Sequence, residues 1–146
     1  MKVILLIEDN DSDEILTVRA LRKHNIANEI AIVRDGAEAL DFLFARGDHA
    51  GRDPHDLPTV ALLDLNLPKI GGLDVLRAIR DDERTKYLPV VVLTSSAEEE
   101  DVLRSYDLGA NAYVRKPVEA NEFAEAVKAL GLFWLVVNNP PPRDEA

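Results

Sequence analysis

The sequence predicts a doubly wound α/β domain, in which helices cover both faces of a parallel sheet. Three observations predict this class. Five short apolar, β-branched runs alternate with stretches of helical periodicity. The first, third and fourth runs are apolar at every position, as expected of strands that are buried on both faces. The chain has 146 residues, which is the length of a single domain with a sizeable core.

Each predicted strand is followed by apolar residues that share one face of a helix. The predicted strands are Val3–Ile7, Ile30–Val33, Val60–Leu63, Val90–Leu93 and Ala112–Val114. The helical faces that follow them in order are Ile15, Val18 and Leu21; Ala37, Leu40, Leu43 and Phe44; Leu73, Val75, Leu76 and Ile79; Val102, Leu103 and Tyr106; and Phe123, Val127 and Leu130.

Two connections are predicted from their composition. Arg34-Asp35-Gly36, after the second strand, is interpreted as a turn and a helix cap. Gly47–Pro58 is polar and rich in glycine and proline, so we expect a long surface loop before the third strand.

The C-terminal segment does not follow the strand–helix alternation. Its run Leu132–Val137 is apolar and precedes three prolines, which favour an extended chain. We therefore expect a domain over residues 1–131 and an extension over 132–146, without a separate output domain. The apolar run either folds back on its own domain or binds a partner. We favour a symmetric homodimer through the fifth helix and this run, including Phe133, Trp134 and Leu135.

Composition and charge argue against several classes of protein. The net charge of −10 disfavours nucleic-acid binding, which needs lysine and arginine against phosphates. No apolar run approaches the roughly 20 residues that a membrane span needs. The chain has no cysteine, which excludes disulfides and cysteine-based metal sites. No signal peptide is recognisable, so the expected location is cytoplasmic.

Polar side chains follow four of the predicted strands, at the edge where open α/β sheets bind their ligands. Glu8 and Asp9 follow the first strand, Asp64 the third, Thr94 the fourth and Lys116 the fifth. A single such residue is usually a turn, a cap or a solvated side chain. Compatible groups at four strand ends favour a common site.

The charges at this edge favour a divalent cation. Glu8, Asp9 and Asp64 would carry three negative charges, which one divalent ion and Lys116 neutralise. Carboxylates ~4 Å apart repel by about 4 kcal/mol at an effective dielectric constant of 20. Because only oxygen ligands are present, the expected ion is Mg²⁺ or Mn²⁺. Asp64, which ends a central strand, is the best candidate to attack a phosphoryl group, with Lys116 and Thr94 stabilising the phosphoryl oxygens.

The acidic run that begins at Glu8 contains a misleading pattern. Asp9, Asp11 and Asp13 have the spacing of the first three ligands of an EF-hand loop. The sixth and twelfth positions of such a loop would be Glu14 and Ala20, which excludes a calcium loop. We expect Asp11 to cap the first helix with Glu14 completing a capping box. Asp13 then lies in the first turn, where the helix dipole favours a negative charge.

Together these motifs resemble the receiver domain of two-component response regulators. The resemblance covers about residues 3–130 and implies a flavodoxin-like fold with five parallel strands in the order 2-1-3-4-5. The matching features are Glu8-Asp9, Asp64-Leu65-Asn66-Leu67-Pro68 with Gly72, Thr94 followed by a small residue, and Lys116-Pro117 three residues after Tyr113.

The resemblance also assigns the metal ligands. It implies that Asp64 is the phosphoacceptor and that Asp9 and Asp64 bind Mg²⁺ directly. The backbone carbonyl of Asn66 would be a third protein ligand, and Glu8 would act through water.

The remaining roles concern the phosphoryl group and the signal. The resemblance implies that Thr94 and Tyr113 form a switch pair, that Lys116 binds phosphate, and that the peptide bond from Lys116 to Pro117 is cis. Asn66 and Ser96 each follow a site residue by two positions, so we expect them to border the path of a hydrolytic water and set the lifetime of the phosphoryl group.

The expected function is that of a stand-alone response regulator. It would accept a phosphoryl group from a sensor histidine kinase onto Asp64 in a Mg²⁺-dependent reaction. It would then switch the surface of its fourth helix, fifth strand and fifth helix, and signal to a partner or relay phosphate. It is not expected to be an enzyme beyond self-catalysed phosphoryl uptake and slow autodephosphorylation.

A narrower resemblance is to regulators that partner phytochrome-like sensor kinases. It rests on LDLNLPKIGG, the long loop before the third strand, and the FWL segment followed by prolines. Gly71 departs from the family pattern, because receivers usually carry aspartate there.

Two other functions are weighed against this one. A phosphatase of the haloacid dehalogenase type needs a second aspartate two residues after the nucleophile, where this chain has Asn66. A flavin or nucleotide carrier needs a glycine-, serine- or threonine-rich loop after the first strand, where this chain has carboxylates.

Overall fold

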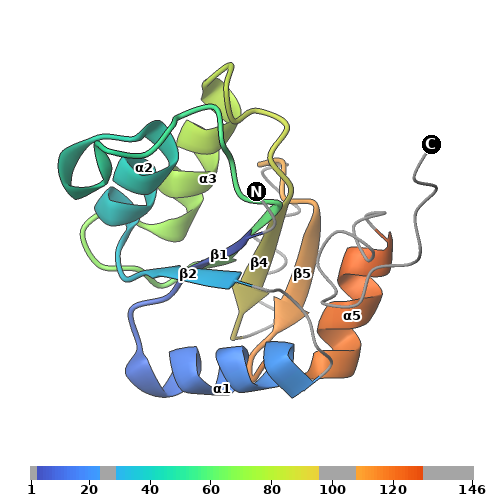
Figure 1. Cartoon of the computed structure of the whole chain (residues 1–146). Coiled ribbons are helices and arrows are strands. Elements are labelled where there is room, and N and C mark those ends of the chain that lie inside the picture. Colours follow the sequence, from blue (N-terminus) through green and yellow to red (C-terminus); the bar gives the residue numbers. More distant parts are fainter. Residues whose placement is uncertain (1–2, 24–28, 96–107, 130–146) are drawn as a thin grey trace, which may run out of the picture.

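The computed structural model describes residues 3–23, 29–95 and 108–129 (Figure 1). Three sets of predictions lie outside these ranges: Ser96, the fourth helix with Val102, Leu103 and Tyr106, and the segment from Leu130 that includes Phe133, Trp134 and Leu135. The elements are β1 (Val3–Ile7), α1 (Asp11–Lys23), β2 (Glu29–Val33), α2 (Gly36–Phe44), the short 3₁₀ helix η1 (Gly47–His49), β3 (Val60–Asp64), α3 (Gly72–Asp81), β4 (Val90–Thr94), β5 (Ala112–Arg115) and α5 (Ala120–Ala129).

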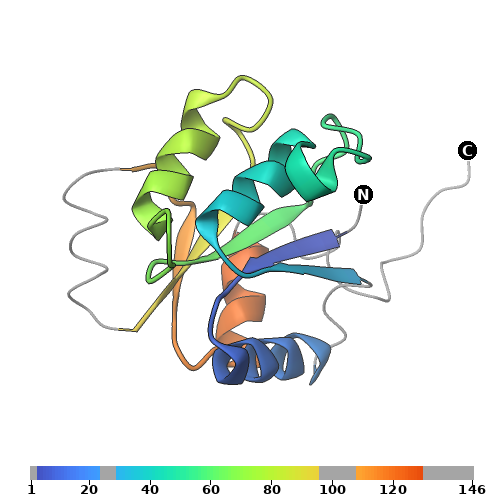
Figure 2. The same cartoon turned by 90° about the vertical axis from the view of Figure 1, so that its left-hand side faces the viewer.

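The five strands form one parallel sheet in the order β2-β1-β3-β4-β5, which confirms both the predicted fold class and the predicted order. Helices α2 and α3 cover one face of the sheet, and α1 and α5 cover the other (Figures 1 and 2). None of the helices in the described ranges has the length and apolar character that crossing a membrane requires.

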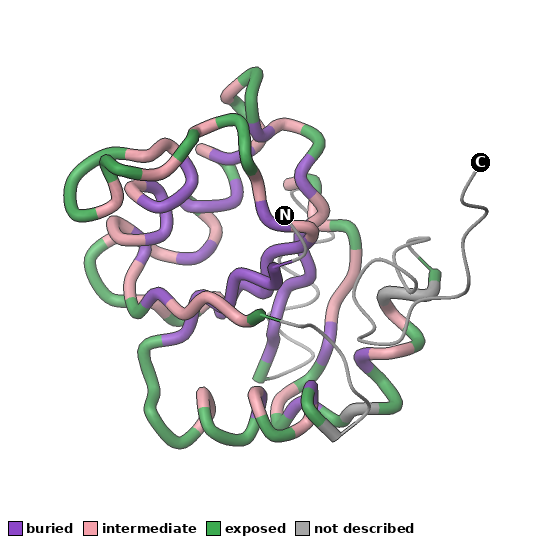
Figure 3. The backbone as a smooth tube through the Cα atoms, viewed as in Figure 1, coloured by how far each residue is buried: buried purple, intermediate pink, exposed green. Residues whose placement is uncertain are grey.

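The core has two parts, one on each face of the sheet. Alternate residues of the central strands pack toward α2 and α3, as Leu5 and Leu63 do, or toward α1 and α5, as Leu6 and Leu62 do. Strands β1, β3 and β4 are buried at every position, which confirms the interpretation of their continuous apolar runs (Figure 3). This burial on both faces fixes the positions of the strand ends.

The first helix differs from its prediction in two respects. It begins at Asp11, and its cap is Asn10, whose Oδ1 accepts a hydrogen bond from Asp13 N at 2.9 Å. Asparagine and aspartate cap helices about equally well, so residue type alone could not place the cap. Glu14 does not complete a capping box, because it forms an ion pair of 2.8 Å with Arg34. The predicted apolar face is also wrong at Ile15, which is 54% exposed, whereas Leu21 is buried.

The second helix begins as predicted. Asp35 is its cap and accepts a hydrogen bond from Glu38 N at 2.7 Å. The carboxylate of Asp35 also forms an ion pair of 3.3 Å with Lys69, which lies in the connection between β3 and α3.

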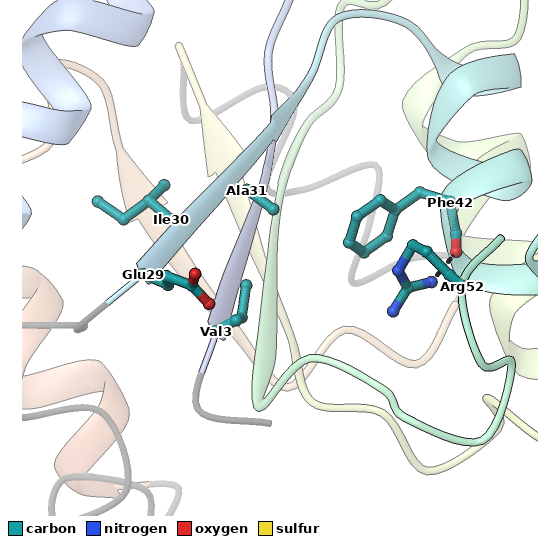
Figure 4. A pocket seen from close by; sticks show the side chains of 6 residues that line it. All are labelled: Val3, Glu29, Ile30, Ala31, Phe42 and Arg52. Atoms are coloured by element: carbon teal, nitrogen blue, oxygen red, sulfur yellow. Dashed lines mark hydrogen bonds between the residues drawn. The ribbon is translucent and has the colours of Figure 1, made fainter. Parts of the chain in front are cut away.

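The long loop before β3 is held against the domain by Arg52. Its guanidinium lies 3.8 Å from the centre of the Phe42 ring and donates hydrogen bonds to the backbone carbonyls of Phe42 and Asp56. A pocket of about 300 Å³ lies beside it, lined by Phe42 and Arg52 together with Val3, Glu29, Ile30 and Ala31 of the neighbouring strands (Figure 4). The predicted surface loop is therefore confirmed, with a packed side chain as its anchor.

Candidate functional site

The carboxyl ends of β1 and β3 bring three acidic side chains together. Ile7 is in register with Leu63, so the residues after β1 lie beside Asp64, the last residue of β3. One carboxylate oxygen each from Glu8, Asp9 and Asp64 lies within 4.8 Å of the other two. The sequence prediction that these three groups converge is confirmed.

The three acidic residues differ in their exposure to solvent. Glu8 and Asp64 are buried, with 0% and 2% of their surface exposed, whereas Asp9 is exposed. Two buried carboxylates at this distance repel each other and need positive charge. Because Asp9 is exposed, the cluster meets solvent on the side of that residue.

Lys116 supplies positive charge to this cluster. Its Nζ lies 2.9 Å from Glu8 Oε1, 3.0 Å from Asp13 Oδ2 and 3.1 Å from Asp64 Oδ2. The backbone fixes its position, because Lys116 N donates a hydrogen bond of 2.7 Å to Thr94 O. The Lys116–Pro117 peptide bond is cis, as predicted.

Burial and the neighbouring charges act on the titration of both partners. The pKa of Glu8 is raised from 4.5 to about 7, mainly because the carboxyl group is buried; Asp64 contributes to the rise, whereas Lys116 opposes it. Burial on its own lowers the pKa of Lys116, but its contacts with Glu8, Asp13 and Asp64 outweigh burial and raise it. Because burial and Asp64 together outweigh Lys116, Glu8 retains a proton up to about neutral pH.

Asp64 is held by backbone and side-chain contacts together. Its Oδ1 accepts a hydrogen bond from Asn66 N at 3.1 Å, and its Oδ2 faces Lys116. The start of α3 lies against the same segment, since Gly72 N donates to Leu65 O at 3.1 Å. A Cβ atom on Gly72 would lie 2.5 Å from Asp64 O, so only glycine allows this approach.

Thr94 ends β4 next to this cluster. It is fully buried, and its Oγ1 has no hydrogen-bond partner among the described residues. A buried hydroxyl without a partner is rare and costs free energy, so it marks a place where an additional group is expected to bind. This supports the prediction that Thr94 donates a hydrogen bond to a ligand.

Tyr113 lies on β5, on the same face of the sheet as Thr94. Thr94 is in register with Arg115 of the neighbouring strand, and Tyr113 lies two residues before Arg115. Side chains two residues apart on a strand point to the same face of the sheet. Tyr113 is partly buried and packs against the core beneath α2 and α3. The two predicted switch residues are therefore diagonal neighbours on one face of the sheet.

Sequence reasoning missed one residue of the site. Asp13 was expected only to favour the helix dipole, but it also forms an ion pair with Lys116. The available signal was its place in the first turn of a helix that begins directly after the acidic pair.

Of the other predicted residues, Asn66 lies next to Asp64 and is exposed, and Ser96 is outside the described ranges.

Comparison with known proteins gives one consistent family. The model of the response regulator receiver domain matches residues 4–128. Among curated proteins, the response regulator Rcp1 of Synechocystis is 40% identical over 134 residues, which are 92% of this chain and 89% of Rcp1.

Solved structures agree with this result. The bacteriophytochrome response regulator RtBRR is 51% identical with a TM-score of 0.88, over 97% of this chain and 85% of that one. The Mn²⁺-bound form of Rcp1 is 39% identical with a TM-score of 0.73, over 97% of this chain and 100% of that one. The carboxylate cluster, the cis peptide bond, the strand order and these matches agree, and the chain belongs to the response regulator receiver domain family.

Proposed function

We propose that this protein is a response regulator that accepts a phosphoryl group from a sensor histidine kinase onto Asp64. The observation that carries the proposal is the convergence of Glu8, Asp9, Asp64 and Lys116 at the carboxyl ends of the strands. Family membership supports a role in signalling, through contacts with other proteins, over a role as a conventional enzyme.

The acidic cluster fits a divalent cation, Mg²⁺ or Mn²⁺. Its three carboxylates include a buried pair, and one ammonium group does not balance their charge. Asp9 and Asp64 would bind the ion directly, Asn66 through its backbone carbonyl and Glu8 through water. When bound, the ion neutralises negative charge on the phosphoryl oxygens. The Mn²⁺-bound structure of Rcp1 supports this assignment.

In the proposed transfer, a carboxylate oxygen of Asp64 attacks the phosphorus of a phosphohistidine. An O–P bond forms as the N–P bond breaks, and the histidine nitrogen keeps the bonding electron pair and takes a proton from solvent. Lys116 donates a hydrogen bond to a phosphoryl oxygen. The hydroxyl of Thr94, which has no partner within the described ranges, donates another. The same residues would allow uptake from a small phosphodonor without a kinase, followed by slow hydrolysis whose rate depends on Asn66 and Ser96.

The signal would pass from Thr94 to Tyr113. Thr94 shifts toward the phosphoryl group to gain a hydrogen bond, and Tyr113 turns inward into the space that Thr94 leaves. The affected surface would comprise β5, α5 and the fourth helix, and the protein would use it to signal to a partner or to relay the phosphoryl group.

The partners are proposed from the relatives. RtBRR and AtBRR are both named bacteriophytochrome response regulators, and they are 51% and 49% identical to this chain. We therefore propose a phytochrome-like histidine kinase as the phosphodonor and, with it, a cytoplasmic location.

We also propose a homodimer that uses α5 and the segment with Phe133, Trp134 and Leu135.

The proposal is tested by incubating the protein with Mg²⁺ and a small phosphodonor and measuring its intact mass. The wild type should gain one phosphoryl group, and Asp64→Asn should gain none. Asp41→Asn is a control outside the site. Asp41 lies on α2 and pairs with Arg46, just beyond the end of that helix, so its replacement should leave uptake unchanged. Equal labelling of the wild type and Asp64→Asn would show that Asp64 is not the acceptor.

A further inference from the structure

Lys116 is surrounded by more carboxylates than its proposed task requires. An ammonium group has three N–H donors, and three carboxylates lie within 3.1 Å of it: Glu8, Asp13 and Asp64. Asp13 accepts a hydrogen bond from Lys116 Nζ, and Glu8 and Asp64 form ion pairs with the same ammonium group. A phosphoryl oxygen that binds Lys116 must therefore compete with these carboxylates.

Asp13 differs from the other two carboxylates in where it lies. It belongs to the first turn of α1 and is 36% exposed, whereas Glu8 and Asp64 lie at strand ends and are buried. Glu8 and Asp64 are also members of the cluster that could hold a metal ion, and Asp13 is not. A metal ion would therefore compete with Lys116 for Glu8 and Asp64 but not for Asp13.

The charge of Asp13 lies close to the reacting carboxylate. Its Oδ2 is 3.0 Å from Lys116 Nζ and Asp64 Oδ2 is 3.1 Å from the same atom, so the two oxygens are no more than about 6 Å apart. Asp13 thus places a negative charge beside the position that an anionic phosphoryl group must occupy. It also weakens the attraction of Lys116 for that group.

We propose that Asp13 is a positioning residue that restrains phosphoryl uptake, because it occupies one donor of Lys116 and repels the incoming anion. The inference rests on the proposed function. Asp13 need not touch the phosphoryl group, since it acts through Lys116. Its removal should therefore speed uptake, in contrast to the removal of Lys116, which should slow it.

The test compares Asp13→Asn with Asp11→Asn, at Mg²⁺ concentrations that saturate each protein. Asp11 lies in the same helical turn, is exposed and has no ion pair within the described part of the chain, so both variants lose one charge at the same helix end. Asp13→Glu keeps the charge and should restore the wild-type rate. Thermal unfolding of each variant verifies that it is folded.

Phosphoryl uptake from a small phosphodonor is followed by intact mass over time. Asp13→Asn should react about threefold faster than the wild type or more, which is the effect of one unit charge about 6 Å away at the dielectric constant of water. Asp11→Asn and Asp13→Glu should stay near the wild-type rate. The affinity for trifluoroberyllate, measured by calorimetry in Mg²⁺, should rise in Asp13→Asn as well, because this anion mimics a phosphoryl group without transfer.

Two results would overturn the inference alone: an unchanged or slower rate in Asp13→Asn, or an equal acceleration in Asp11→Asn. Labelling of the wild type but not of Asp64→Asn would then leave the proposed function intact. Absence of labelling in the wild type would overturn the proposed function and this inference together.

Discussion

The Nζ atom of Lys116 lies 3.1 Å from Oδ2 of Asp64, although the strand β4 separates β3, which ends in Asp64, from β5, which precedes Lys116. The side chain of Lys116 thus reaches across the end of a strand to a buried carboxylate and is itself 14% exposed. This contact joins the residues that follow β5 to the end of β3, so the loss of Lys116 should lower the stability of the protein.

Replacing Lys116 by methionine should destabilise the metal-free protein by about 3 kcal/mol, because it leaves buried carboxylates without a counter-charge. The free energy of unfolding is measured in urea with a chelator present. Lys69→Met is the control, since Lys69 is exposed and pairs with Asp35 at the surface; it should cost about 1 kcal/mol or less. Similar losses for the two variants would contradict the importance of the buried ion pair.

Glu8 should make the stability of the metal-free protein depend on pH. Its pKa is about 7 in the folded protein and 4.5 as its ordinary value, so the folded state holds the proton more tightly. The contribution of Glu8 to stability is therefore fully present below pH 4.5 and is lost as the pH rises through 7. Glu8→Gln cannot lose this proton, so its stability relative to the wild type should increase between pH 5 and pH 8.

This pH dependence is measured by urea unfolding of both proteins in chelator at the two pH values. Taking the difference between wild type and variant removes the titration of groups that the two proteins share. A difference that stays constant from pH 5 to pH 8 would mean that Glu8 has an ordinary pKa.

Gly72 should tolerate no side chain, because a Cβ atom there would lie 2.5 Å from Asp64 O and 2.6 Å from the Cα of Leu65. Gly72→Ala should cost about 2 kcal/mol of stability through overpacking. Gly71→Ala is the matched control, since its nearest contact would be Asp74 at 3.9 Å. It should cost about 1 kcal/mol or less, as expected at a helix cap. Chemical denaturation of both variants tests the contrast, which equal costs would refute.

Thr94→Val should leave the stability of the unphosphorylated protein unchanged or raise it by about 1 kcal/mol, because it removes a buried hydroxyl that has no hydrogen-bond partner in the described part of the chain. Thr85→Val should do the opposite and cost about 1–2 kcal/mol. Thr85 is equally buried, but its hydroxyl donates a hydrogen bond of 2.6 Å to Ile79 O. Thermal unfolding compares the two variants. A large loss for Thr94→Val would show that its hydroxyl already has a partner in this state.

Features set by the ends of buried strands could be predicted well from the sequence. Strands such as β3 are apolar at every position, so their limits are clear and Asp64 is placed to within a residue. Because parallel strands end at the same edge of the sheet, the convergence of Glu8, Asp9 and Asp64 could be inferred from the sequence alone.

Features of the helices and side chains were less predictable. The cap of α1 depended on a choice between Asn10 and Asp11, which have similar capping ability. Ile15 has the spacing of the helical apolar face that includes Leu21, but Leu21 is buried and Ile15 is exposed. The contact between Asp13 and Lys116 could not be predicted either. It depends on how α1 is rotated against the sheet, and the sequence pattern of one helix does not define that rotation.

The position of the phosphoryl group tests most directly whether Asp64 is the acceptor. After reaction with a small phosphodonor and Mg²⁺, borohydride reduces an aspartyl phosphate to homoserine, and tandem mass spectrometry of the digested protein identifies the modified residue. We expect modification at Asp64 and its absence from the Asp64→Asn variant. Modification at Glu8, at Asp9 or at a residue outside the site, with Asp64 unmodified, would contradict the proposed role of Asp64.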